Sequence, residues 1–225
     1  GMILALQKVQ KFVWSLNPKP VILAGHSLGG MQVRFASTLI PRNQIEKLIL
    51  LFSPSVTHIP PKEERLLFNM ARFLSVQVFL DDLACIYTAC FSEIWRKTAL
   101  INYVSLYQGT RLKNFFGAPN FDRQILEKSV DGYMYWEATK EILADISNAS
   151  FESPNGEDLI QKWVTMKNRP PTISFVGGLD KLAVPTTLKA EANELGYQYR
   201  ELSVGHAGAF VDSVQLYDMA RAFSE

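Results

Sequence analysis

A serine with one glycine two positions before it and another two positions after it is the part of this sequence best suited to chemistry. Ser27 lies between Gly25 and Gly29, after the apolar run 21–24 and before a helix-compatible stretch at 30–40. A serine on a tight turn from strand to helix adopts strained backbone angles, and glycines at these positions remove Cβ atoms that would collide there. The pattern predicts a nucleophile elbow at Ser27, although the five-residue match alone also fits a glycine-rich turn.

A serine hydroxyl is a poor nucleophile without a neighbouring base, and the sequence offers three histidines. His26 is the variable position of the elbow, and we expect its side chain to point away from the nucleophile. His58 lies at the start of a helical segment, where a surface or capping role is the default. His206 lies in a Gly-His loop after the last predicted strand, and parallel sheets carry functional groups at the carboxyl ends of their strands. His206 is therefore the predicted base.

The base needs an acid that orients it, and Asp180 is the candidate. It follows the strand predicted at 172–176, in a glycine-containing turn. An aspartate in such a turn is often a helix N-cap or a turn residue, which is the alternative interpretation. The order Ser27, Asp180, His206 along the chain, with each residue at the end of a strand, favours the catalytic interpretation.

These side chains need a scaffold whose strands end side by side, and the hydrophobic pattern predicts one. Apolar runs typical of buried parallel strands alternate with stretches whose apolar residues recur at helical spacing. Strands are predicted at 20–26, 48–52, 172–176 and 197–204, and helices at 3–16, 30–40, 186–195 and 209–223. This alternation indicates an α/β fold with a parallel sheet flanked by helices.

The middle of the chain has a different pattern, because its apolar spacing is helical and no strand of comparable quality occurs. We interpret 55–169 as a mostly helical cap insertion into a core made of 1–54 and 170–225. Its aromatic residues fit helix–helix packing, and a lining for an apolar acyl group is the alternative. Its helical stretches are predicted at 60–74, 82–97, 122–147 and 156–167.

Composition narrows the classes of function. The 225 residues are 48% hydrophobic and 20% charged, and the net charge of +1 gives no basic surface for nucleic acid. No apolar run reaches the roughly 20 residues that cross a bilayer. No histidine pair has metal-ligand spacing, and no cofactor is predicted. Cys85 and Cys90, five apart in a predicted helix, are expected to be reduced and buried. Together with a start that lacks a basic signal-peptide region, they favour the cytoplasm.

Three motifs resemble those of the α/β-hydrolase fold family. Its members carry Gly-His-Ser-Leu-Gly-Gly at the elbow, Gly-x-x-Asp followed by Val-Pro after a later strand, and a Gly-His loop near the C-terminus. In this chain these motifs are residues 25–30, 177–185 and 205–206. The resemblance covers 18–54 and 170–223, and it implies a partial α/β-hydrolase fold. The mostly helical cap predicted from the hydrophobic pattern has no recognisable family motif.

The resemblance also implies a reaction. Ser27 would attack an acyl carbonyl, His206 would act as general base and then as general acid, and Asp180 would orient the imidazole. The leading hypothesis is a lipase- or esterase-like serine hydrolase that cleaves a carboxylic ester, with the cap selecting an apolar acyl or alcohol group. A thioesterase or an acyltransferase uses the same three residues. A non-catalytic interaction protein, which binds through its uncovered strand or its cap, is a hypothesis of a different class.

The sequence departs from the family pattern before the elbow. Family members place four strands ahead of the elbow strand, and an early loop supplies one backbone donor of the oxyanion hole. Here only one predicted helix precedes position 21. The backbone N–H of Leu28 supplies one donor, the second is unassigned, and a missing donor costs about a hundred- to a thousandfold in turnover.

The same departure leaves the strand at 20–26 with an apolar edge that invites pairing with another chain. Three hypotheses follow. The chain is a fragment, it forms a homo-oligomer through this edge, or the cap covers the edge.

Overall fold

A computed structural model of the chain describes most of both predicted core segments and little of the insertion. None of the helices in this described part has both the length and the apolar composition that a bilayer crossing requires. The helices predicted at 60–74, 82–97 and 122–147, with Cys85 and Cys90, lie outside it. The described residues are 2–58, 151–153, 155–180, 182–206, 208–210 and 212–224.

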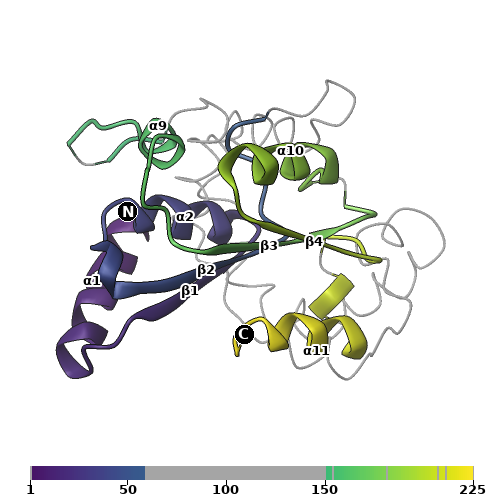
Figure 1. The fold of residues 1–225 in the computed structure, drawn as a ribbon, viewed down its shortest axis with the longest axis horizontal. Helices are drawn as coiled ribbons and strands as arrows, with labels where there is room; N and C mark the ends of the chain where they lie inside the picture. Colours follow the sequence, from purple (N-terminus) through teal and green to yellow (C-terminus); the bar gives the residue numbers. More distant parts are fainter. Residues whose placement is uncertain are drawn as a thin grey trace, which may run out of the picture.

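In the described residues, four parallel strands form one sheet in the order β1-β2-β3-β4 (Figure 1). The parallel sheet predicted from the sequence is therefore confirmed. Because all four strands run the same way, their carboxyl ends meet at one edge of the sheet, where functional groups can converge. The strands are β1 (Val21–His26), β2 (Ile45–Leu51), β3 (Thr172–Gly177) and β4 (Gln198–Leu202).

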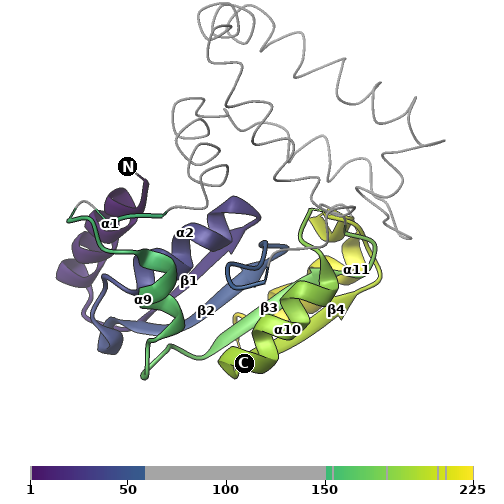
Figure 2. The same ribbon diagram turned by 90° about the horizontal axis from the view of Figure 1, so that it is seen from above.

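Helices cover both faces of the sheet. In Figure 1, α2 and α10 lie on one face and α11 lies on the other. Figure 2 shows α2 beside β1 and α10 beside β3 and β4. This cover explains why β2 and β3 are buried along nearly their whole length. The described α-helices are α1 (Met2–Leu16), α2 (Leu28–Ser37), α9 (Leu159–Val164), α10 (Pro185–Leu195) and α11 (Ser213–Arg221).

Successive residues of β2 point into two separate cores. Ile49 packs in one cluster with Phe175 and Met219 of α11. Its neighbour Leu48 packs in another with Ala36 of α2 and Trp163 of α9. Side chains alternate between the faces of a strand, so the part of β2 that helices cover on both faces, 48–51, is apolar at successive positions.

Strand β1 lies at the edge of the sheet, because β2 pairs with one side and no described strand pairs with the other. On the neighbouring helix α1, apolar side chains are exposed: Val9 (59%), Phe12 (62%) and Leu16 (70%). That this edge pairs with a second copy of the chain, or that the cap covers it, stays a prediction.

The start predicted for the helix at 209–223 is wrong. Residues Gly208–Phe210 form a short 3-10 helix, and α11 begins only at Ser213. Asp212 caps α11, because its Oδ1 accepts the N–H groups of Val214 (3.1 Å) and Gln215 (3.2 Å). A capping side chain needs non-helical backbone at its own residue, and Asp212 has φ −115° and ψ 110°.

The helix predicted at 156–167 is observed as α9, and it packs against the core. Phe151 and Leu159 form one apolar cluster with Met31 and Phe35 of α2. Asp158 caps α9 by accepting the N–H of Gln161 at 3.0 Å. The boundaries of the cap insertion, 55 and 169, stay a prediction.

Candidate active site

Ser27 occupies the turn between β1 and α2, as the elbow pattern predicts. Its backbone has φ 52° and ψ −120°, and its N–H donates to the carbonyl of Leu51 at 2.8 Å. This hydrogen bond anchors the turn to the carboxyl end of the neighbouring strand β2. A left-handed φ at a non-glycine residue is uncommon, and it presents the side chain away from the regular path of the strand.

The glycines around Ser27 differ in what they do. A Cβ at Gly25 would lie 2.2 Å from the carbonyl oxygen of Gly29, so position 25 requires glycine. A Cβ at Gly29 would meet no described atom within 4 Å, so the expected collision at that position is wrong. The crowded position is Gly30, where a Cβ would lie 2.3 Å from the Cβ of Ser53. The reason is that α2 begins at Leu28, which turns position 29 outward and position 30 towards the loop after β2.

His206 lies within hydrogen-bonding distance of both other predicted site residues. Its Nε2 is 2.9 Å from Ser27 Oγ, and its Nδ1 is 2.8 Å from Asp180 Oδ2. His206 and Asp180 are buried, with 4% and 1% of their surface exposed. An ionised carboxylate next to Nδ1 favours the tautomer in which Nδ1 carries the proton, which leaves Nε2 to accept the proton of the serine hydroxyl.

The two carboxylate oxygens of Asp180 have different partners, and each fits one of the two interpretations of its sequence context. Its Oδ1 accepts the N–H groups of Leu182 (2.8 Å) and Ala183 (3.0 Å), as a turn residue would, while Oδ2 faces His206. The approach of the two loops depends on Gly177, where a Cβ would lie 2.5 Å from the carbonyl oxygen of Val204. The end of β3 can therefore come close enough to the loop after β4 for Asp180 to reach the imidazole.

His26 lies beside the imidazole of His206. The two ring centroids are 5.1 Å apart, and His26 Nε2 is 3.4 Å from the His206 carbonyl oxygen. The His26 ring also meets Phe210 edge-on, with 4.8 Å between centroids. Burial of the ring, followed by the charge of His206, lowers the pKa of His26 from 6.5 to about 4. His26 is therefore neutral near pH 7.

Two further predicted positions can be placed. Leu28 is the first residue of α2, so its N–H has no acceptor inside the helix and can serve an oxyanion. A second donor stays unassigned. His58 is exposed at its side chain, and its Nε2 lies 2.9 Å from Glu194 Oε2, a surface position as expected. Among the described residues, no group of three potential metal ligands occurs.

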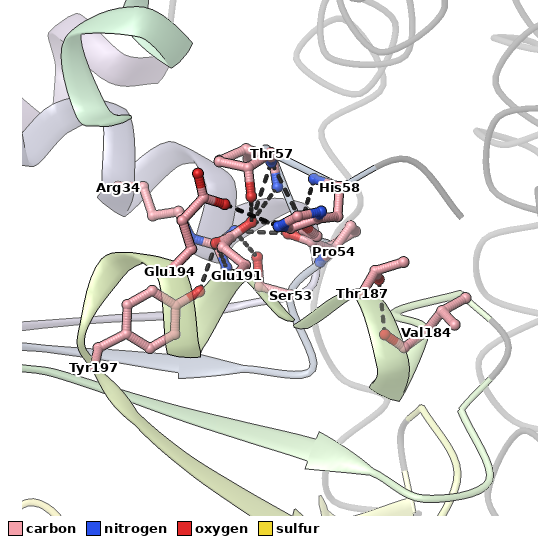
Figure 3. Close-up of polar contacts among 12 residues, drawn as sticks. Arg34, Ser53, Pro54, Thr57, His58, Val184, Thr187, Glu191, Glu194 and Tyr197 are labelled. Atoms are coloured by element: carbon pink, nitrogen blue, oxygen red, sulfur yellow. Dashed lines mark hydrogen bonds and ion pairs between the residues drawn. The ribbon is translucent and has the colours of Figure 1, made fainter. Parts of the chain in front are cut away.

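Sequence reasoning missed a buried ion pair between α2 and α10 (Figure 3). Arg34 of α2 and Glu191 of α10 are both fully buried, with 3.2 Å between Nη2 and Oε1. The signal was the position of Arg34 inside the apolar run of α2, between Val33 and Phe35. A charged residue rarely occupies such a position without a partner. Its partner, however, lies 157 positions later in the chain, where periodicity cannot identify it.

Phe52 is a second unusual backbone position close to the site. Among the described non-glycine residues, Ser27 (φ 52°) and Phe52 (φ 51°) have positive φ. Each follows the end of one of the neighbouring strands β1 and β2. Such angles cost on the order of 1–3 kcal/mol and persist only where surrounding contacts fix them. The Phe52 ring is fully buried and lies 6.4 Å from the ring of His206.

Comparison with known proteins shows the fold. No family model matches the chain, and no curated protein sequence matches it. Among solved structures, it is similar to an esterase from Exiguobacterium antarcticum, with 14% identity and a TM-score of 0.55 over 97% of this chain and 72% of the esterase. It is also similar to the epoxide hydrolase CorEH, with 18% identity and a TM-score of 0.57 over 96% of this chain and 71% of that one.

A third similar structure is the thioesterase domain from the curacin biosynthetic pathway, with 17% identity and a TM-score of 0.53. The similarity covers 97% of this chain and 70% of that domain. Identities this low establish a shared architecture and leave the reaction open. With its parallel sheet, its flanking helices and these neighbours, the chain has a partial α/β-hydrolase fold.

Proposed function

We propose that this protein is a serine hydrolase that cleaves a carboxylic ester through an acyl-enzyme on Ser27. The observation that carries the proposal is a pair of contacts made by the His206 imidazole. Its Nε2 is 2.9 Å from Ser27 Oγ, and its Nδ1 is 2.8 Å from Asp180 Oδ2. A serine is activated when a base lies within hydrogen-bonding distance of its hydroxyl and a third group orients that base.

The first half of the reaction transfers the acyl group to the protein. Ser27 Oγ bonds to the acyl carbon while its proton passes to His206 Nε2, and the carbonyl electron pair moves to the oxygen. The N–H of Leu28 donates to this oxyanion. Asp180 stabilises the imidazolium across Nδ1. When the carbonyl re-forms, the bond to the alcohol oxygen breaks and the alcohol takes the proton from Nε2.

The second half returns Ser27 to its starting state. A water molecule gives a proton to His206 Nε2 as its oxygen bonds to the acyl carbon. The bond from that carbon to Ser27 Oγ then breaks, and Oγ recovers the proton from Nε2. The products are a carboxylic acid and an alcohol, and the protein is unchanged.

The substrate proposal is an ester with an apolar acyl or alcohol group, selected by the cap predicted at 55–169. Two of the similar structures are an esterase and a thioesterase domain, so a thioester substrate or an acyl acceptor other than water is the alternative. The epoxide hydrolase among the neighbours shows that the fold does not decide the reaction. The serine at position 27 favours acyl chemistry, because its hydroxyl forms an acyl ester that water can then hydrolyse.

Ester turnover by the purified protein tests this proposal. Nitrophenyl esters from acetate to palmitate and matching acyl thioesters form the panel, and Ser27→Ala is the control for background hydrolysis. We expect turnover that rises with acyl length and that Ser27→Ala abolishes. Turnover that survives Ser27→Ala would assign the activity to another group, and turnover of thioesters alone would favour the alternative.

A further inference from the structure

The buried ion pair connects the two helices that begin next to the predicted nucleophile and acid. Arg34 belongs to α2, which starts immediately after Ser27, and Glu191 belongs to α10, which starts at Pro185, five residues after Asp180. Both charged side chains have no exposed surface. A movement of α2 away from α10 would separate these two charges.

The same two side chains hold the segment that leaves β2, residues 53–57, which we call the β2 exit loop (Figure 3). Arg34 Nη1 donates to Ser53 Oγ at 3.0 Å and to the Pro54 carbonyl at 2.7 Å. Glu191 Oε2 accepts the backbone N–H groups of Val56 (2.6 Å) and Thr57 (3.2 Å). The ion pair is thus the common anchor of α2, α10 and this loop.

Glu191 stays ionised in this environment. Burial alone raises its pKa, but the Arg34 charge and hydrogen bonds from Ser55, Tyr197 and Val56 outweigh burial, so its pKa lies below the ordinary value. The hydroxyls of Ser55 and Thr57 also donate to Oε2, and Tyr197 donates to Oε1. The carboxylate thus accepts donors from the loop on one oxygen, and Arg34 and Tyr197 contact the other.

The loop begins directly after Phe52, whose backbone is in the left-handed region and whose ring lies near the predicted base. The Phe52 ring lies edge-on to His206 at 6.4 Å and to His26 at 6.1 Å between centroids. Ser53 sits against the first turn of α2, where only a glycine at position 30 leaves room for it. Without its anchor, the loop could relax Phe52 to an ordinary backbone conformation and move the ring away from the imidazole.

We propose that Arg34 and Glu191 are positioning residues, which hold the β2 exit loop so that Phe52 keeps the His206 imidazole in line with Ser27. The inference rests on the proposed function, because it assigns these residues to the reaction at Ser27. It differs from a purely structural role, because a buried ion pair can often be replaced by neutral side chains without loss of stability.

The main test therefore removes both charges together. Arg34→Met with Glu191→Gln leaves no unpaired buried charge, and the glutamine oxygen can still accept an N–H from the loop. We expect this double variant to stay folded but to react with a fluorophosphonate at Ser27 about 10- to 100-fold more slowly. For ester hydrolysis, kcat should fall by a similar factor while KM changes less than about threefold. The single variant Arg34→Lys, with Glu191 intact, keeps both charges. Its reaction at Ser27 should be faster than that of the double variant.

A matched pair of milder variants covers the case in which the double variant fails to fold. Ser53→Ala removes a hydrogen bond of Arg34 within the loop, and Tyr197→Phe removes one of Glu191 outside the loop. Positioning predicts a several-fold slower reaction in Ser53→Ala and a change under twofold in Tyr197→Phe. Equal effects in the two variants would overturn the proposal.

A spectroscopic readout separates this inference from the proposed function. The low-field proton signal of His206 Nδ1–H, identified by its loss in His206→Gln, should broaden or move in the double variant, or in Ser53→Ala if the double variant does not fold. Unreactive wild-type protein would refute the proposed function, while this signal still reports on the imidazole. An unchanged signal in the folded variant, or reaction at the wild-type rate, would overturn the positioning role.

Discussion

His206 Nε2 lies 2.9 Å from Ser27 Oγ, although 179 positions separate the two residues in the chain. The parallel sheet produces this contact. Ser27 follows the end of β1, Asp180 follows β3 and His206 follows β4, and parallel strands bring their carboxyl ends to one edge. β1 and β4 lie at opposite edges of the described sheet, so loops must span the distance between their ends. Gly177 contributes to this, because it lets the loop after β4 approach the end of β3.

Asp180→Asn should separate the two functions of this carboxylate. Asparagine can still accept the N–H groups of Leu182 and Ala183 through its carbonyl oxygen, so we expect little change in the free energy of unfolding. It removes the charge that orients His206 and stabilises the imidazolium, and kcat should fall by up to about 10⁴-fold, the effect of the equivalent change in a well-studied serine protease. Asp180→Ala should lose the turn hydrogen bonds as well and unfold about 1 kcal/mol more easily.

Urea titration and ester kinetics on the two variants provide the measurement. If Asp180→Asn kept kcat within a fewfold of the wild-type value, Asp180 would be a turn residue only, which was the alternative interpretation of its sequence context.

Gly25→Ala and Gly29→Ala form a matched pair on the elbow. The first places a Cβ 2.2 Å from the backbone oxygen of Gly29 and should destabilise the protein by about 1–3 kcal/mol or more. The second meets no described atom within 4 Å and lies in a helix, where alanine is favoured over glycine by up to about 1 kcal/mol. Urea titration of both variants would contradict the described elbow if Gly29→Ala were the more destabilised.

The sequence predicts the elbow well, because strand, glycine, serine and helix are local features. It also predicts that Ser27, Asp180 and His206 come together, as the structure has them. It does not predict which glycine beyond the serine is crowded, since that depends on Ser53 reaching α2 from another strand. The same reason hides Arg34 and Glu191, whose pairing exists only after α2 and α10 pack on one face. The predicted start of α11 was too early, because the helical spacing in the sequence continues through position 212. In the structure Asp212 is the N-cap, so the helix begins after it.

His26 should make the stability depend on pH in the acidic range. Its folded-state pKa of about 4 lies below the ordinary value of 6.5, so the folded protein binds fewer protons at this site than the unfolded chain between these values. The contribution of His26 is therefore fully present above about pH 6.5 and is lost as the pH falls towards 4. His26 is exposed to solvent as a whole residue, although its ring packs against His206 and Phe210. The effect should therefore be modest.

Urea titrations at pH 7.5, 6, 5 and 4.5, compared between the wild type and His26→Asn, measure this contribution. The variant should lose less stability on acidification. Equal pH dependence in both proteins would mean that His26 is protonated as readily in the folded as in the unfolded state.

Arg34 and Glu191 should show strong coupling in a double-mutant cycle of stability. Glu191→Gln alone leaves the Arg34 charge buried beside a neutral group, and breaking such a pair on one side costs about 3–5 kcal/mol. Arg34→Met alone leaves the Glu191 carboxylate unpaired, with a similar cost. The double variant should lose much less than the sum of the two, because no buried charge is left uncompensated. Additive losses would mean that the two side chains do not interact in the folded protein.

Covalent labelling of the purified protein with a fluorophosphonate shows directly whether Ser27 is an activated nucleophile, because it needs no knowledge of the natural substrate. Intact mass and peptide mapping report the site and the stoichiometry, with Ser27→Ala and His206→Ala as controls. We expect one label per chain, on Ser27, with little labelling in either variant. A folded wild-type protein that takes no label would contradict an activated serine at position 27. Equal labelling of Ser27 in His206→Ala would contradict activation of that serine by His206 and Asp180.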